Sequence, residues 1–416
     1  MVTQKKNTAG RRPRQPRFGI ATLALVALAA GAALIGCGTQ KGAPGEAGST
    51  AKEGQAAAEQ ASAALVVEGK RVFRFDTFGD EQFWTDTLHM NEVVEKSLDP
   101  TTALKLGLKV DAEVLPPGIL EKVDLKSPAT TVALLKMNAI VGIQATVDAE
   151  NHITRLGVTC ALCHSTVDNS VMAGIGLRKD GWPNRDLNVG AIIALSPALP
   201  AEKKAVYKSW GPGKYDPRFN LDGKNTPLVI PPAYGLAQVK NETYTAEGPI
   251  SYWNAYVAIT QMGGHGNFSD ARLGIDIKQA PPDLVTPKLP ALRAYQHSLS
   301  APPPPAASFN AAAAERGRAL FGQACSTCHV GATGTDNNTG KLHPAADTGV
   351  DAAYAARTAN KAYRTTPLRA LWQHPPYFHD GSAATLADVV AHYNRVRTLK
   401  LTAEQQRDLV EYLKSL

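Results

Sequence analysis

Residues 160–164 read Cys-Ala-Leu-Cys-His, and residues 325–329 read Cys-Ser-Thr-Cys-His, so the pattern C-x-x-C-H occurs twice. Two thiols at this spacing can each add to a vinyl group of one haem, and the histidine that follows is then placed to bind the iron. The sequence therefore predicts two covalent haems. The attaching residues are Cys160, Cys163 and His164 for one haem and Cys325, Cys328 and His329 for the other. Zinc or a disulfide is the alternative, although one such motif lacks the second ligand pair that zinc needs.

The chain begins with a segment typical of export. Six lysines and arginines between Lys5 and Arg17 precede an apolar stretch from Ile20 to Ile35, which is shorter than the roughly 20 residues of a membrane-spanning helix. We interpret residues 1–36 as a signal peptide. Residues 34–37, Leu-Ile-Gly-Cys, resemble a bacterial lipobox, with an ordinary cleaved signal as the alternative. We therefore expect lipidation at Cys37 and a periplasm-facing lipoprotein anchored to a bacterial membrane, the outer one.

The charges nearly balance once the signal is set aside. The whole chain has 44 lysines and arginines against 37 aspartates and glutamates, and six of the basic residues lie in the signal, which has no acidic residue. A balanced surface gives no electrostatic support to nucleic-acid binding. We expect no nucleic-acid partner.

Composition divides the remainder into two folded parts. Residues 37–66 are rich in Gly, Ala, Ser, Glu and Gln and contain no aromatic residue, which is typical of a flexible tether. Four consecutive prolines mark a second connector over residues 298–312. The expected domains are residues 67–297 and 313–416, each with one haem motif and each of ordinary domain size.

The domain over residues 313–416 has clear helix signals. Asn310 is expected to cap a helix in which Gly317 and Phe321 share one face, and Thr402 with Gln405 forms the capping box of another helix. Terminal helices of this kind around a haem resemble the mostly α-helical class I cytochrome c fold. The whole chain is therefore predicted to be mostly α.

The domain over residues 67–297 is less regular. Apolar residues alternate with polar ones from Val141 to Val147, a polar cluster follows at 148–151, and an apolar run resumes at Ile153. This pattern predicts a small β-hairpin just before the first haem motif. Frequent Pro and Gly beyond the motif indicate long irregular segments.

Three segments after the second motif resemble a known family. They are Thr-Thr-Pro-Leu-Arg at 365–369, Pro-Tyr-Phe-His-Asp-Gly-Ser at 376–382 and Thr-Leu-Ala-Asp-Val-Val-Ala-His-Tyr-Asn at 385–394. They look like the C-terminal domain of the bacterial di-haem cytochrome c peroxidases and their relative MauG. Asn-Thr-Pro-Leu-Val at 225–229 resembles the segment before that family's inter-haem tryptophan. Ser-Trp-Gly-Pro-Gly at 209–213 looks more like the rubber oxygenase branch.

The resemblance implies an oxidoreductase in which electrons pass between two haems and peroxide or oxygen reacts at the first. It implies a small redox protein or a quinone-linked electron donor as partner. Trp253 is then the inter-haem indole, with plain packing in the interface as its alternative, and Gln261 and His265 are the polar candidates on the peroxide side. The alternative function is a di-haem electron carrier without peroxidase activity.

The same resemblance implies a calcium site between the haems. Asn225 and the backbone oxygens of Thr365 and Pro367 match that site, and oxygen ligands suit Ca²⁺. Family members usually reach the first haem motif soon after the mature N-terminus, whereas here a long extension precedes it, which includes Asp-Thr-Phe-Gly-Asp-Glu-Gln-Phe-Trp at 76–84. No chemistry is assigned to that extension.

Axial ligands decide what each iron can do. Residues 313–416 contain no methionine, so a His/Met pair within that domain is excluded. The resemblance places Tyr393 at the position where MauG has its tyrosine ligand, and a phenolate favours ferric iron and a low potential. The alternatives are that Tyr393 merely packs on its helix and that the ligand is His343, His374, His379 or His392. For the first haem, His89, Met90 and His265 are the candidates, and the choice stays open.

Overall fold

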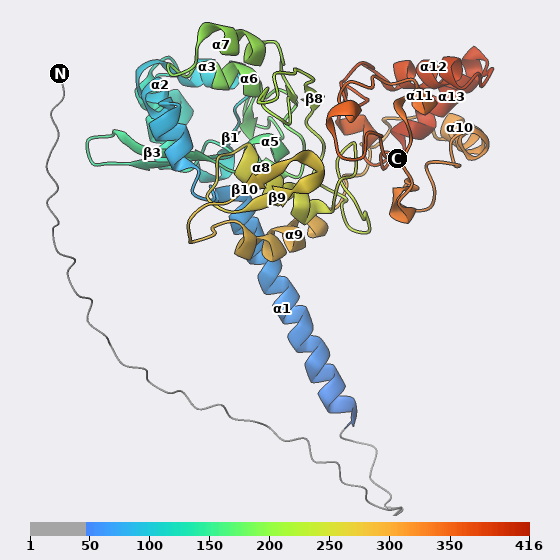
Figure 1. The fold of residues 1–416 in the computed structure, drawn as a ribbon, viewed down its shortest axis with the longest axis horizontal. Coiled ribbons are helices and arrows are strands. Elements are labelled where there is room, and N and C mark those ends of the chain that lie inside the picture. Colours follow the sequence, from blue (N-terminus) through green and yellow to red (C-terminus); the bar gives the residue numbers. More distant parts are fainter. Residues whose placement is uncertain (1–46) are drawn as a thin grey trace, which may run out of the picture. The chain divides into compact units, whose positions relative to one another are not determined.

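Helices joined by long irregular segments make up most of the chain in the computed structural model, which describes residues 47–416 (Figure 1). The expected signal peptide and Cys37 lie outside the described residues. The helices are α1 (Ala47–Phe75), α2 (Met90–Ser97), α3 (Pro100–Lys105), α4 (Pro128–Lys136), α5 (Ala161–His164), α6 (Val189–Ile193), α7 (Ala201–Lys208), α8 (Ile250–Thr260), α9 (Leu289–Ser298), α10 (Ala311–Ala324), α11 (Ala345–Thr348), α12 (Leu386–Val396) and α13 (Ala403–Lys414), with one π-helix, η1 (Gln82–Thr87). The strands are β1 (Val110–Asp111), β2 (Ile143–Val147), β3 (Ile153–Val158), β4 (Ser165–Val167), β5 (Ile175–Gly176), β6 (Arg178–Asp180), β7 (Lys214–Tyr215), β8 (Leu228–Val229), β9 (Phe268–Asp270) and β10 (Ile275–Ile277).

Helix α1 occupies much of the segment that we expected to be a flexible tether. Alanine, glutamate and glutamine are strong helix formers, which explains why this composition gives a helix. Close packing fixes its C-terminal part. A side chain at Gly69 would lie 2.0 Å from the carbonyl oxygen of Ala291 in α9, and Phe73 packs edge-on against Tyr295 with ring centroids 5.5 Å apart. The expected boundary at residue 67 therefore falls inside a helix.

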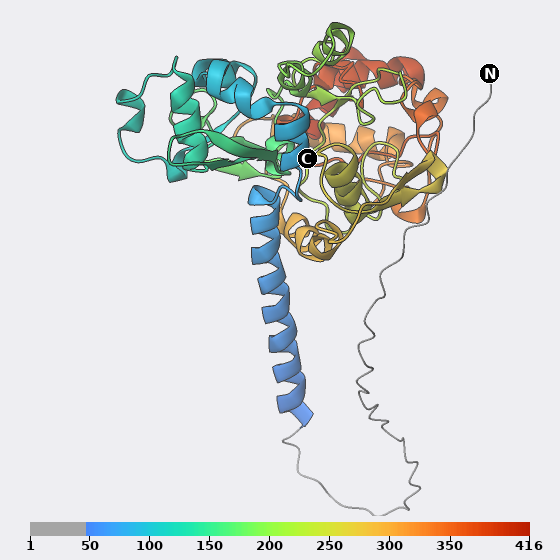
Figure 2. The same ribbon diagram turned by 60° about the vertical axis from the view of Figure 1, so that its left-hand side comes forward.

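The predicted β-hairpin is confirmed. Strand β2 pairs antiparallel with β3, with Ile143 opposite Val158, and α2 and α4 pack against the pair (Figures 1 and 2). The other strands of the described residues also pair only two by two. Strand β3 ends two residues before Cys160, so the hairpin leads directly into the first motif, which forms the single turn α5.

One buried carboxylate fastens the chain on both sides of the first motif. Asp180 of β6 accepts hydrogen bonds from Ser165 of β4 at 2.8 Å, from Arg74 of α1 at 2.5 Å and from the hydroxyl of Tyr295 in α9 at 2.5 Å. Because β4 begins one residue after His164, these bonds tie the motif to α1 and α9.

The two helices predicted around the second motif are also confirmed. Asn310 caps α10 by accepting a hydrogen bond from the amide of Ala313 at 2.9 Å, and Thr402 and Gln405 form the capping box of α13. The helices cross at Gly317, where a side chain would lie 2.1 Å from the carbonyl oxygen of Asp408 (Figure 1). Only glycine permits so close an approach of two helices.

Residues 55–416 cluster as one compact unit, yet their apolar core is divided. One buried cluster draws on residues 66–299 and another on residues 321–416. A small third cluster, of Leu228 with Tyr354, Ala355 and Tyr363, contains residues of both ranges. Ion pairs between buried side chains also join them: Arg357 makes a bidentate pair with Asp216 at 2.9 and 3.1 Å, and Arg364 pairs with Glu242 at 3.1 Å. Within residues 47–416, no helix is both long enough and apolar enough to cross a membrane.

Candidate functional site

The two haem motifs open onto one cavity of about 420 Å³. Its wall includes Cys160, Cys163 and His164 from the first motif and Cys325, Cys328 and His329 from the second. Neither cysteine pair forms a disulfide. Burial raises the pKa of the thiols of Cys160 and Cys163 to about 12 and that of Cys325 to about 11. Cys160, Cys163 and Cys325 therefore present neutral thiols to a shared space.

Both motif histidines are oriented as iron ligands need to be. Nδ1 of His164 donates a hydrogen bond to the carbonyl of Pro231 at 3.0 Å, and Nδ1 of His329 donates to that of Gly334 at 3.0 Å. A carbonyl can only accept, so Nδ1 carries the proton and Nε2 keeps its lone pair. Burial lowers the pKa of His164 to about 4 and also lowers that of His329, so both rings are neutral at pH 7.

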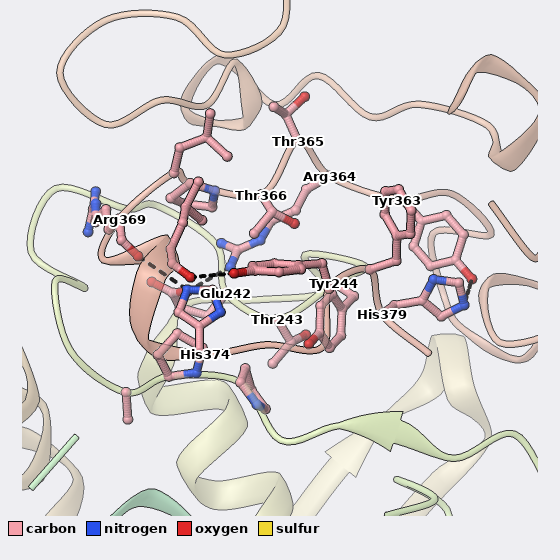
Figure 3. A pocket seen from close by; sticks show the side chains of 18 of the residues that line it. Glu242, Thr243, Tyr244, Tyr363, Arg364, Thr365, Thr366, Arg369, His374 and His379 are labelled. Carbon is pink, nitrogen blue, oxygen red and sulfur yellow. Dashed lines mark hydrogen bonds and ion pairs between the residues drawn. The ribbon is translucent and has the colours of Figure 1, made fainter. Parts of the chain in front are cut away.

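Several buried polar atoms of the cavity wall have no partner among the described residues. They are Nε and Nη1 of Arg185, Nε of Arg364, Oε1 of Glu242, Oγ1 of Thr243 and Nε1 of Trp253. A buried polar atom without a hydrogen-bond partner costs free energy, so these atoms favour a ligand with polar or charged groups in the cavity. Haem carries carboxylates that match the arginines, and its apolar faces match the rest of the wall. Figure 3 shows the Glu242–Arg364 pair with Arg369 and His374 nearby.

Of the five proposed ligands for the second haem, Tyr393 is the most available. It lies in α12 on the cavity wall, and its hydroxyl makes no hydrogen bond within residues 47–416. Burial, with the nearby thiols of Cys325 and Cys328, raises its pKa to about 12. The phenol is therefore neutral until a cation binds its oxygen.

Each competing histidine already uses its Nε2 atom. His374 and His392 donate from Nε2 to the carbonyls of Arg369 and Thr348 at 3.2 and 2.7 Å. Nε2 of His343 faces the carboxylate of Asp336 at 3.0 Å, and Nε2 of His379 lies 3.1 Å from the hydroxyl of Tyr363 (Figure 3). His392 does not line the cavity. A bond from Nε2 of any of them to iron would have to break one of these contacts.

Asp336 and His343 also form, with Cys328, the one cluster of metal-ligand type found among the described residues. The three ligand atoms lie within 4.8 Å of one another. Haem attachment would use the same sulfur, and Nε2 of His343 already faces Oδ2 of Asp336 at 3.0 Å. We interpret this group as packing beside the second motif.

The residues predicted for the peroxide side separate in space. Trp253 and Gln261 line the cavity, whereas His265 does not and instead places Nε2 2.7 Å from the carbonyl of Ala280. His89 and Met90 are also absent from the wall: His89 is half exposed beside Glu92, and Met90 is buried in the apolar core.

Two wall residues near Gln261 were not predicted. Trp84 comes from the extension and Met262 follows Gln261, and both line the cavity. The indole Nε1 of Trp84 donates a hydrogen bond to the carbonyl of Met262 at 2.9 Å. The aromatic and acidic residues at 76–84 were the signal for Trp84, but nothing local in the sequence connects them to Cys160.

The residues of the predicted calcium site carry other contacts. Oδ1 of Asn225 accepts a hydrogen bond from the indole of Trp210 at 2.8 Å, and the carbonyl of Thr365 accepts one from Thr335 at 2.6 Å. Thr365 and Pro367 line the cavity, whereas Asn225 is exposed outside it. The calcium site stays a prediction that needs Asn225 to move to the wall beside Thr365 and Pro367.

Helix α10 leads into a C-x-x-C-H motif and is crossed by the later helix α13, an arrangement that defines a cytochrome c domain. Residues 314–416 match the family model for cytochrome c. A domain of this class carries covalently bound haem c and transfers electrons. A chain of Kuenenia stuttgartiensis hydrazine synthase is similar at 21% identity, over 46% of this chain and 73% of that one, with a TM-score of 0.33. A TM-score this low defines no shared fold. Among curated proteins, no sequence matches this chain.

Proposed function

We propose that the chain is an exported di-haem oxidoreductase of the cytochrome c peroxidase and MauG type. In this proposal electrons pass between the two haems, and peroxide or oxygen reacts at the first. The observation that carries it is the single cavity, whose wall holds both attachment motifs together with Trp253, Gln261 and Tyr393. Bound haem supplies the redox chemistry, and the protein sets ligation, access and spacing.

The side chains have distinct roles in this proposal. His164 and His329 offer Nε2 to the two irons, and the free hydroxyl of Tyr393 closes the second site. Gln261 donates from Nε2 to the carbonyl of Pro217 at 3.0 Å, so its Oε1 remains an acceptor. With the unpartnered Nε1 of Trp253, the first site then has one donor and one acceptor for a small ligand. Neither group releases a proton near neutral pH.

Haem stoichiometry tests the foundation of the proposal. The pyridine haemochrome spectrum of the purified protein should give two haems per chain, because two complete motifs face the cavity. Cys160→Ser with Cys163→Ser, and separately Cys325→Ser with Cys328→Ser, should each remove one haem. One haem in the parent protein, under ample haem supply, contradicts the di-haem proposal.

Met262 favours a second candidate, an electron carrier without substrate. Its thioether belongs to a residue on the wall beside Gln261, and a thioether on iron would close the first site. Carbon monoxide separates the two functions. Binding to one ferrous haem supports the enzyme, whereas two closed haems, with a methionine-to-iron charge-transfer band lost in Met262→Leu, support the carrier.

The proposal includes a lipid anchor at Cys37 and a periplasm-facing location on the outer membrane. The export signal and the lipobox-like end at Leu-Ile-Gly-Cys support it, and Cys37 is the one cysteine outside the two motifs. The partner is then a small redox protein or a quinone-linked donor at that surface. Cys37→Ser should move the protein from the membrane fraction to the soluble fraction. An unmodified N-terminus in soluble wild-type protein contradicts the anchor.

A further inference from the structure

The segment 76–84, which has no role in the function proposed above, is deeply buried. The exposed fractions of Phe78, Asp80 and Trp84 are 1%, 0% and 7%. The chain then continues through η1, and π-helices are rare and often lie at functional sites. Trp84 lines the cavity that both haem motifs share, so the segment is part of its wall.

One side of the segment holds the strand that leads to the first motif. Both carboxylate oxygens of Asp80 lie 3.3 Å from the amide of Val158, which is itself on the cavity wall. Thr85 accepts a hydrogen bond from the amide of Leu156 at 2.9 Å. The segment is therefore tied to β3 immediately before Cys160.

The other side holds the turn that follows α8. The carbonyl of Phe78 accepts a hydrogen bond from the amide of His265 at 2.7 Å, and the indole of Trp84 donates to the carbonyl of Met262 at 2.9 Å. Between these two contacts, Gly263 has φ +88°, and a Cβ atom there would lie 2.7 Å from Cβ of Phe83. The shape of this turn thus depends on the segment.

This turn fixes the backbone at and beside Gln261. The amides of Gln261 and Met262 both donate to the carbonyl of Val257, at 3.0 and 2.9 Å, and end the helix there. The side chain of Gln261 is fixed by Pro217 at one end, and its backbone is fixed through Met262 by Trp84 at the other. Both hydrogen bonds are buried. The carbonyl of Pro217 also accepts from the hydroxyl of Tyr256 at 3.0 Å, whereas loss of the indole donor leaves the carbonyl of Met262 without a side-chain partner among residues 47–416.

We propose that Trp84 is a positioning residue for Gln261, and that the extension thereby shapes a site for a small hydroxylic ligand, such as water or hydrogen peroxide, at the first haem. Gln261 accepts a hydrogen bond from the ligand and Trp253 donates one to it. This inference rests on the proposed reaction at the first haem. It gives the extension a function in the site.

The test compares Trp84→Phe, Gln261→Leu and the double variant in the haem-loaded protein. Phenylalanine keeps one aromatic ring in the core and removes the N–H donor together with the second, fused ring. We expect the rate constant for the reaction with hydrogen peroxide, followed at the Soret band, to fall roughly two- to tenfold in Trp84→Phe, as for the loss of one hydrogen bond. The double variant should be no slower than Gln261→Leu, since Trp84 acts through Gln261.

Trp210→Phe is the matched control. Its indole is buried and donates to Asn225 at 2.8 Å, but it does not line the cavity, so this variant should react like the parent. Equal losses in Trp84→Phe and Trp210→Phe, or additive losses in the double variant, overturn the positioning role.

The reduction potential of the first haem tests the same role without peroxide. Trp84→Phe and Gln261→Leu should shift it in the same direction, and the double variant should shift it no further than Gln261→Leu. If the parent protein does not react with hydrogen peroxide, the proposed function is contradicted but the positioning role is not. Independent shifts of the potential contradict the positioning role alone.

Discussion

Gly317→Ala tests the helix crossing that makes residues 314–416 a cytochrome c domain. The new methyl group would lie 2.1 Å from the carbonyl oxygen of Asp408, 2.6 Å from its carbonyl carbon and 2.9 Å from Cβ of Tyr412. Ordinary contact begins at 3.4 Å, and the nearest atoms are backbone, so α13 must move away by more than an ångström. This movement opens the apolar contact of Phe321 with Leu409 and Leu413.

Overpacking of this kind costs about 1–3 kcal/mol, and the separated helices add to that cost. Gly322→Ala is the control, because it makes the same change in the same helix at a position with no heavy atom within 4 Å. There alanine should stabilise the protein by up to about 1 kcal/mol through helix propensity. Guanidinium unfolding of the haem-loaded protein, followed at the Soret band, measures both. Equal free energies of unfolding for the two variants would refute the crossing.

Three further predictions concern buried groups. Arg357→Met should lower the free energy of unfolding by about 3–5 kcal/mol, because it leaves the fully buried Asp216 without its cation. Arg155→Met removes an exposed ion pair and should cost under about 1 kcal/mol, and denaturant titration of both variants makes the comparison. Tyr393→Phe should replace a low-spin ferric signal of the second haem by a high-spin one in electron paramagnetic resonance, and an unchanged spectrum would exclude this ligand. Burial raises the pKa of Asp80 to about 9, so the folded protein keeps a proton that the unfolded chain loses above its ordinary pKa of 3.8. Stability should therefore fall as the pH rises from about 4 to about 9, and thermal midpoints should show Asp80→Asn more stable than the parent at pH 8 and equal to it at pH 4.

Local patterns predicted the local structure well. The alternation from Val141 predicted the hairpin, and the capping residues Asn310 and Thr402 predicted the two helices of the cytochrome c domain. Each of these signals depends on neighbours in sequence. The helix over 47–66 was not predicted, because a composition of Ala, Glu, Gln and Gly is typical of both a linker and a helix.

The candidate site was only partly predictable because its wall comes from distant segments. The attachment motifs carry their own chemistry and needed no fold. Trp84 and Met262 join the wall only because α1 and the hairpin bring the extension against the turn after α8. His265 shows the converse: it follows Gln261 by four residues, but the turn at Gly263 directs it to Ala280 and away from the cavity.

The shared cavity has a consequence for biosynthesis. Residues 314–416 are synthesised after residues 47–313, and they supply a large part of the cavity wall, including Tyr393 and Arg364. Until they fold against the earlier residues, we expect the apolar lining around Cys160 to be open to water and the first motif to be accessible to haem. Docking of residues 314–416 then covers both motifs and forms the ion pair of Arg357 with Asp216. We therefore expect haem attachment at the first motif to precede this docking.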